Sequence, residues 1–383
     1  MSNSLSPIRT LITALGPPDI LDAAVVIPAR NEQRRVTACL NALAVAIDGA
    51  HPVRTGLVIV VNNSDDATCD RVSAWAVAHP HISVQVIDCE FPPSEAHAGA
   101  ARRFGLDFAL KRLKSDGILF TSDADSRVRP DWITSNLTAL LHADLICGAF
   151  AADQDEARLL PAAVDRHCQV ESDYMCVAVK LAALLDPVPH DPDPPHLNAS
   201  GASLAFTQQL YETVGGMPAI NMSEDRAFAA LAERHDFRVR HSKAIMVDTS
   251  CRMTGRTIGG MAGALRERAI EVDPVVDQWL EPASNFVKRY QLRGRLRSAW
   301  PNPTALRGRL ATALGVEEST RLMSAPLPAT FGAFLEQIEA TTAALTRMRM
   351  RISDCHAELP KLVDFYARLS DFAASLQPKR QAR

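Results

Sequence analysis

The most constraining feature of this sequence is a repeated order of apolar segment, polar loop and amphipathic segment. The apolar segments are short and mostly rich in β-branched side chains, as expected of buried strands. They are Ala23–Ile27, Leu57–Val61, Ser83–Ile87, Gly117–Phe120 and Leu145–Phe150. Apolar residues at helical spacing follow the first three segments, and a helix is expected to begin near Pro130 after the fourth. This alternation predicts right-handed βαβ units and a mostly parallel α/β sheet flanked by helices.

The composition excludes several classes of protein. The chain has 383 residues and a formal net charge of -3, with 47% apolar and 22% charged residues. This balance is typical of a folded globular protein and gives no reason to expect nucleic acid as a partner. No apolar run approaches the roughly 18 residues that a membrane span needs. The eight cysteines show no CxxC or zinc-finger spacing, which favours free thiols in a reducing cytoplasm.

The later part of the chain changes character. A proline-rich stretch at 186–198 reads as an extended loop, and Val239–Val247 reads as another strand. From Leu306 onward, apolar residues recur at steps of three and four, which indicates amphipathic helices. The simplest arrangement is a helical hairpin packed against the α/β part.

Polar loops follow the predicted strands, and these loops predict the place of a binding site. In parallel sheets, ligands bind outside the carboxyl ends of the strands. We therefore expect a site built from Pro28–Glu32, Asn62–Asp66, Ala98–Arg103 and Ser122–Ser126.

Two aspartates stand directly after the fourth strand. Asp123 and Asp125 flank Ala124, so their carboxylates can converge on a hard divalent cation beside a diphosphate. The same triplet pattern occurs at 153–155 and 191–193, but only the first lies between a strand and the start of a helix. The alternative is an Asx turn that caps the helix near Pro130.

Further charged residues are candidates for chemistry. Glu224 and Asp225 open a helix after a Gly-Gly turn, where they either complement the helix dipole or supply a general base. Arg252 and Arg256 follow the strand that ends near Val247; they are either solvated or paired with a diphosphate leaving group. His241 is a candidate additional ligand for a cation on Asp125, although no histidine spacing indicates zinc.

In the order of its motifs the chain resembles the family 2 glycosyltransferases of the bacterial type, which have the Rossmann-like GT-A fold. The motifs are VVIPARNE, VVNNSDDAT, AGAARRFG, ILFTSDADS, SGASLAF, SEDRAFA and DTSCRMTGR, and they span roughly 22–265. The resemblance implies inverting transfer of a sugar from a nucleoside-diphosphate sugar to an unknown hydroxyl acceptor, with Mg²⁺ or Mn²⁺. Because no QxxRW motif follows, we expect a non-processive enzyme. Asn62-Asn63 replaces the family's usual acidic pair, and Ser203 stands where asparagine is common.

The same resemblance implies roles for single residues. Asp123 and Asp125 would bind the metal, with Asp123 also at the nucleotide sugar, and Asp225 would be the base beside Glu224. Arg102 would lie near the nucleobase or the diphosphate of the donor. Arg252 and Arg256 would lie at the diphosphate. The nucleoside pocket would be lined by Pro28, Ala29, Asn31, Glu32, Asn62 and Asp66.

The resemblance also suggests a division of the chain: an N-terminal extension at 1–21, a GT-A glycosyltransferase domain at 22–265, and a helical C-terminal region at 266–383. A segment at about 282–316 carries seven basic residues and no acidic residue. It is either a solvated linker or a contact with an anionic membrane or a lipid-linked acceptor, which would place the cytoplasmic protein at the inner face of the membrane.

Two other functions are considered. A nucleotidyltransferase would need a Gly-rich, Lys-bearing loop after the first strand, where this chain has PARNE. A non-catalytic nucleotide-sugar-binding homologue commonly loses the Asp-x-Asp acids or the base, and this chain has both.

Overall fold

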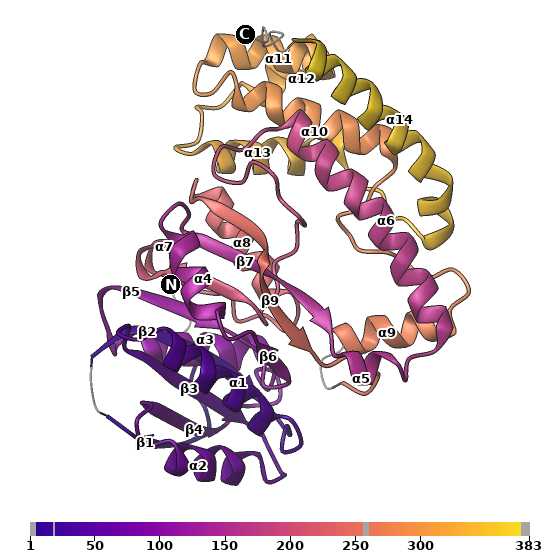
Figure 1. Cartoon of the computed structure of the whole chain (residues 1–383). Helices are drawn as coiled ribbons and strands as arrows, with labels where there is room; N and C mark the ends of the chain where they lie inside the picture. The colour runs from indigo at the N-terminus through magenta and orange to yellow at the C-terminus, as the bar shows by residue number, and fades with distance from the viewer. Residues whose placement is uncertain (1–4, 18–19, 256–259, 377–383) are drawn as a thin grey trace, which may run out of the picture. The chain divides into compact units, whose positions relative to one another are not determined.

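The structure is a computed structural model that describes residues 5–17, 20–255 and 260–376 (Figure 1). Contacts divide the chain into two compact units. Unit 1 comprises Met1–Leu159, Asn198–Glu233 and Phe237–Leu265, and unit 2 comprises Leu160–Leu197, Arg234–Asp236 and Arg266–Arg383. The segment 160–197, which we expected within the domain at 22–265, therefore groups with the C-terminal helices.

Unit 1 is built on a mixed sheet that has nine strands in the described residues. The strands are β1 (Arg9–Leu15), β2 (Leu21–Ala29), β3 (Thr55–Asn62), β4 (Val84–Glu90), β5 (Leu113–Thr121), β6 (Ser126–Val128), β7 (Leu145–Ala152), β8 (Leu204–Thr207) and β9 (Val239–Thr249). Their order is β1-β4-β3-β2-β5-β8-β7-β9-β6. All the strands predicted from apolar runs are confirmed.

The sheet is mixed, with more antiparallel pairing than the sequence led us to expect. The pairs β2/β3, β2/β5, β3/β4 and β7/β9 are parallel, whereas β1, β6 and β8 pair only antiparallel. These three strands were not predicted, because β6 and β8 are only three and four residues long and β1 lies in the segment taken as an N-terminal extension. The α/β class itself is confirmed.

Helices cover both faces of this sheet. One hydrophobic cluster joins it to α1 (Val36–Gly49), α2 (Thr68–Ala78) and α4 (Trp132–Leu140). A second cluster on the other face involves α3 (Ala98–Leu110), α7 (Gln208–Thr213) and α8 (Glu224–Arg234). Successive residues of β2 alternate between the clusters, as side chains of a strand must.

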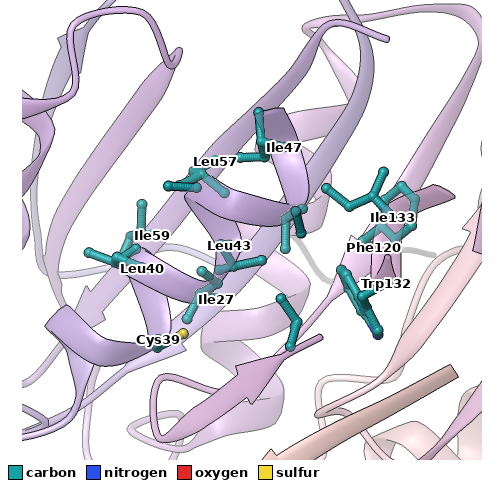
Figure 2. Packing of buried hydrophobic residues seen from close by; sticks show 14 of the residues in the cluster. Ile27, Cys39, Leu40, Leu43, Ile47, Leu57, Ile59, Phe120, Trp132 and Ile133 are labelled. Carbon is teal, nitrogen blue, oxygen red and sulfur yellow. The ribbon is translucent and has the colours of Figure 1, made fainter. Parts of the chain in front are cut away.

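The packing of α1 shows why the spacing of apolar residues in the sequence correctly predicted this helix and its neighbouring strands. Leu40, Leu43 and Ile47 lie at helical spacing and pack on Ile27 and Ile59 of the neighbouring strands (Figure 2). All five side chains are at most 9% exposed. Each such buried side chain contributes about 1.5–3 kcal/mol of transfer free energy to folding. The core therefore fixes the strand ends from which the candidate site loops depart.

Unit 2 is helical. Besides α6 (Ala162–Leu185) it contains α10 (Ala283–Arg297), α11 (Pro303–Leu314), α12 (Val316–Leu322), α13 (Phe331–Thr341), the short 3₁₀ helix η1 (Ala343–Leu345) and α14 (Ile352–Leu376). The expected hairpin is not what forms: α14 shares a cluster with α6 and α10, whereas α13 packs in a separate cluster with α10, α11 and α12. Two shorter helices complete the list: α5 (Gln154–Ala157) belongs to unit 1, and α9 (Met261–Ile270) spans the boundary between the units in the sequence. In the part of the chain that the structure describes, no helix combines the length and apolarity of a membrane span.

The basic segment at 282–316 is not a linker. It forms α10 and α11, and three of its arginines pair with acids outside the segment. Arg289 is buried and lies 2.6 Å from Glu281, which has no exposed surface. Arg297 pairs with Asp186 at 2.7 Å. Arg293 lies 3.5 Å from Glu339.

Candidate active site

The loops after β2 and β3 are joined by hydrogen bonds. Asn31 donates its backbone N–H to Ser64 Oγ at 3.0 Å and its side-chain amide to Asp65 at 2.6 Å. Glu32 donates its backbone N–H to Thr68 Oγ1 at 2.7 Å. The two loops therefore form one surface at the carboxyl ends of their strands, as predicted.

Strained backbone is concentrated around these loops. Four non-glycine residues in the described chain have a positive φ, and three of them belong to the predicted site segments or directly precede one. Asn31 has φ 53°, Asn63 has φ 47° and Ser223, just before Glu224, has φ 58°. Such conformations cost free energy and cluster at functional sites.

Some residues of the predicted nucleoside pocket hold the protein structure together, whereas others have polar atoms that a ligand could bind. Pro28 and Ala29 are buried at the end of β2. Asp66 accepts the backbone N–H groups of Thr68 and Gln33, at 2.9 and 3.2 Å, so it holds the loop and the start of α2 together. Asn62 is 2% exposed and its Nδ2 has no hydrogen-bond partner among the described residues. Because an unsatisfied buried donor is costly, Asn62 is the pocket residue best placed to bind a ligand.

Arg102 does not face solvent, where a ligand would bind. Its side chain is 3% exposed and lies behind two acids of the site. Its Nη2 donates to Asp123 at 2.7 Å, and its Nε donates to Glu224 at 3.2 Å. The two acids raise the pKa of Arg102 against the opposing effect of its burial. Arg102 thus joins the Asp-x-Asp motif to the Glu-Asp pair of α8.

A second arginine joins the other aspartate to the first loop. Arg252 donates to both carboxylate oxygens of Glu32, at 2.9 and 2.5 Å, and lies 3.1 Å from Asp125. Glu32 is 7% exposed. Asp125 also accepts the backbone N–H of Ser250 at 3.3 Å through its main-chain carbonyl. Each aspartate of the motif therefore shares one arginine with a distant glutamate.

Glu156 organises this second group, and the sequence did not point to it. It accepts hydrogen bonds from Arg35 at 2.7 Å, from Ser250 Oγ at 2.5 Å and from the backbone N–H of Cys251 at 2.9 Å. These bonds hold the turn that carries Arg252. Because the partners lie 94 to 121 residues away, no local spacing could have revealed the contact.

The carboxylate of Asp225 is oriented by backbone donors. Its Oδ2 accepts the N–H of Gly201 at 2.7 Å, and its Oδ1 accepts the N–H of Arg226 at 2.7 Å. Asp225 is partly exposed, whereas Glu224 is buried at 7% exposure. Burial raises the pKa of Glu224, which Arg102 partly offsets. The two acids of the pair therefore have different environments.

The site carries an excess of negative charge. Five carboxylates are grouped around two arginines, and they belong to Glu32, Asp123, Asp125, Glu224 and Asp225. Burial, together with the neighbouring charge of Asp123, raises the pKa of Asp125 to about 7. Such a shift indicates a place where a cation would be favoured, because a positive charge would offset the repulsion between the acids.

One predicted residue, His241, is not brought into this cluster. His241 pairs with Cys147, and five residue steps along β7 separate Cys147 from Ala152, the partner of Thr249. At roughly 3.3 Å per residue His241 lies about 17 Å from the end of β9 beside Asp125, so its proposed metal role is wrong. Arg256 lies outside the described residues. Ser203 is buried and accepts a hydrogen bond from the Trp132 indole at 2.9 Å, which makes it a core residue.

Comparisons with known proteins give one family match and several similar solved structures. Residues 18–183 match the family described as Glycosyltransferase like family 2. No curated protein matches the chain. Solved structures with similar folds include TarS 1–349 of S. aureus, with 14% identity, a TM-score of 0.44 and coverage of 94% of this chain and 93% of that one.

Two further solved structures are similar at the same level. The mannosyltransferase PcManGT from Pyrobaculum calidifontis, in complex with GDP-Man and Mn²⁺, shows 15% identity, a TM-score of 0.40 and coverage of 94% and 88%. Glucosyl-3-phosphoglycerate synthase from Mycobacterium tuberculosis, in complex with Mn²⁺, UDP and phosphoglyceric acid, shows 16% identity, a TM-score of 0.37 and coverage of 65% and 77%. All three TM-scores lie under 0.5, so the assignment rests on the family match and the site. The match over residues 18–183 supports a glycosyltransferase as the enzyme class of the chain.

Proposed function

We propose that unit 1 transfers a sugar, with inversion at the anomeric carbon, from a nucleoside-diphosphate sugar to a hydroxyl acceptor, with the help of a divalent cation. The observation that carries this proposal is the Arg102 contact with both Asp123 and Glu224. Through this contact, Asp123, which is expected at the donor diphosphate, and the Glu224-Asp225 pair, which is expected at the acceptor, belong to one network. The family match over residues 18–183 supports the same reaction class.

The residues present fit a cation that shares its ligands with a substrate. Among the described residues, no group of three or more His, Cys, Asp or Glu side chains is arranged to hold a metal ion. Mg²⁺ and Mn²⁺ in sites of this kind need only one or two carboxylates, because phosphate oxygens and water complete the shell. Asp123 and Asp125 would supply those carboxylates. The bound cation would offset the charge that develops on the departing diphosphate.

On the donor side, the chain's own groups bind and orient the nucleotide. Asn62 supplies an unpaired amide at the base of the joined loops. Arg252 has a planar guanidinium that matches phosphate oxygens, and it is only 17% exposed. Its ion pairs with Glu32 and Asp125 hold it at the site.

On the acceptor side, Asp225 is the proposed general base. Its two hydrogen bonds from backbone N–H groups fix the direction of the carboxylate, so that a free lone pair can accept the proton of the attacking hydroxyl. Glu224 is buried against Arg102, so we assign it the positioning of the helix start instead of proton transfer. The attacking oxygen and the departing diphosphate lie on opposite sides of the anomeric carbon, which gives inversion.

A donor panel tests the proposal. The protein is incubated with Mn²⁺ and UDP-Glc, UDP-GlcNAc or GDP-Man, and released nucleoside diphosphate is measured with water as the acceptor. Asp225→Asn serves as the low-activity control. For the reactive donor, proton NMR at early times identifies the first anomer of the free sugar. We expect release from one donor and a first-formed anomer opposite to that of the donor.

Other outcomes would replace the proposal. Donor binding without any release of diphosphate would indicate a nucleotide-sugar-binding homologue. Release of pyrophosphate from a nucleoside triphosphate and a sugar 1-phosphate would indicate a nucleotidyltransferase. A first-formed anomer that matches the donor would leave glycosyl transfer in place and overturn inversion.

We extend the proposal to the acceptor through the remaining basic residues of α10 and α11. Four of the seven are exposed: Lys288, Arg295, Arg307 and Arg309. Exposed cations of this number favour contact with an anionic surface, at about 1 kcal/mol per residue near an anionic bilayer. A lipid-linked acceptor or an anionic membrane would provide such a surface.

A further inference from the structure

The backbone of Gly201 contacts both sides of the candidate site. Its N–H donates to Asp225 Oδ2 at 2.7 Å. Its carbonyl oxygen accepts from Arg102 Nη1 at 3.0 Å and also from the hydroxyl of Thr121. The backbone of one residue, through its N–H and its carbonyl oxygen, therefore lies between the proposed base and the arginine that contacts Asp123.

Glycine is needed at this position for space. A Cβ added to residue 201 would lie 2.5 Å from Nη2 and 2.6 Å from Cζ of Arg102. Such distances are too short for carbon, and Arg102 is not a flexible surface side chain that can move away, because it is 3% exposed. The backbone of Gly201 does not require the left-handed region. The absence of a side chain thus allows the guanidinium to lie directly against the peptide.

Arg102 is held on several sides at once. It donates to Asp123 at 2.7 Å, to Glu224 at 3.2 Å and to the Thr121 hydroxyl at 3.0 Å, in addition to the Gly201 carbonyl. The planar fork of arginine can span these acceptors, whereas the single ammonium group of lysine cannot. A displacement of Arg102 would therefore move Asp123 and the start of α8 together.

We propose that Arg102 and the backbone N–H and carbonyl groups of Gly201 form a positioning bridge, which sets the carboxylate of Asp123 on the donor side relative to that of Asp225 on the acceptor side. The bridge rests on the proposed function for the roles of these two acids. Neither Arg102 nor Gly201 is a catalytic residue in this account. They fix the distance and direction between two groups that act on the same substrate pair, and a misplacement of about 1 Å can cost about 10²-fold in rate.

The test compares two perturbing variants with two matched controls. Gly201→Ala inserts a methyl group against Arg102, and Arg102→Lys keeps the charge but loses the fork. Gly308→Ala adds the same methyl group where nothing lies within 4 Å. Arg238→Lys changes an arginine outside the site segments, which bonds Asp144 and no acid of the site.

Three quantities are measured on folded protein: the donor dissociation constant with Mn²⁺, the turnover of the reactive donor, and the NMR signal of the Arg102 Nε–H group that donates to Glu224. We expect Gly201→Ala to shift this signal and to lower turnover about 10²-fold. We also expect it to weaken donor binding about 10-fold, the effect of one charge-assisted hydrogen bond. Arg102→Lys should show the same turnover and binding losses, and both controls should match wild type.

The outcomes separate the bridge from simpler roles. Lower turnover with unchanged donor affinity would mean that Gly201 acts on Asp225 alone, which overturns the bridge. A lower melting temperature with wild-type turnover and affinity would reduce Arg102 to a core ion pair, and it also overturns the bridge. If wild-type protein binds no nucleotide sugar, the proposed function fails, and the Arg102 signal in Gly201→Ala alone decides whether the two residues are coupled.

Discussion

Arg252 donates two hydrogen bonds to the carboxylate of Glu32, at 2.9 and 2.5 Å, although 220 residues separate them in the chain. The same guanidinium lies 3.1 Å from Asp125. Glu32 is therefore an ion-pair partner of Arg252. The arginine expected at the diphosphate is therefore held beside Asp125, one of the two aspartates that we propose bind the metal.

The first prediction concerns Arg252. Replacing it by Gln should raise the donor dissociation constant about 10- to 100-fold, because charge-assisted hydrogen bonds to phosphate oxygens are lost. Isothermal titration calorimetry in Mn²⁺ measures this change. Arg71→Gln, which changes an exposed arginine on α2, should bind the donor like wild type. Equal donor affinity in the two variants would show that Arg252 only neutralises Glu32 and Asp125.

The second prediction concerns the proposed base. Asp225→Asn should lower turnover by about 10² or more, while the donor dissociation constant stays near wild type, because the base acts on the acceptor in the transition state. The amide oxygen can still accept the Gly201 N–H, so the fold should be retained. Asp116→Asn, at a side chain that is 78% exposed, is the control. A raised dissociation constant with unchanged turnover would make Asp225 a binding residue.

The third prediction concerns the exposed cations of α10 and α11. Wild-type protein should sediment with anionic vesicles at low salt and not at high salt, since surface attraction is screened. Exchange of Lys288, Arg295, Arg307 and Arg309 for Gln should abolish this binding. Exchange of the ion-paired Arg297 alone is the comparison. If wild-type protein stays in the supernatant with both anionic and neutral vesicles at low salt, the membrane contact is contradicted.

The fourth prediction concerns acid stability at the other end of β2. Hydrogen bonds from the Arg54 side chain and backbone lower the pKa of Asp22 to about 2. A carboxyl with a depressed pKa stabilises the fold above its unfolded value, near 4, and loses this effect as pH falls towards 2. After solvent screening, wild type should exceed Asp22→Asn by about 1 kcal/mol at pH 7. Urea unfolding should show this difference disappear towards pH 2; a difference that is constant with pH would contradict it.

The sequence predicted those parts of the fold that depend on local patterns. Apolar runs with β-branched residues located β2, β3, β4, β5, β7 and β9, because buried strands need such runs whatever surrounds them. β1 was not predicted because it is an edge strand with an exposed, mixed sequence. β8 was not predicted because a strand of four residues shows little periodicity. The spacing of Leu292, Leu296, Leu306 and Leu310 is a helical signal that should have excluded a linker at 282–316.

The site was predictable in its residue types and not in its pairings. Asp123, Asp125 and Asp225 follow strands or open a helix, so their positions could be inferred from local context. The pairings with Arg102 and Arg252 depend on how distant parts of the chain pack together, which residue spacing does not reveal. The error at His241 has the same origin, because the position of a residue along β9 depends on its register with β7.

Asp123 and Asp125 are proposed to bind the donor through a divalent cation. Calorimetric titration of the reactive nucleotide sugar with Mn²⁺ and then with a chelator tests this claim most directly, with Asp123→Asn and Asp125→Asn as variants. The account predicts tight binding by wild type in Mn²⁺, and strongly weakened binding in chelator and in both variants, because bare carboxylates repel a diphosphate. Equal wild-type affinity in Mn²⁺ and in chelator would contradict it.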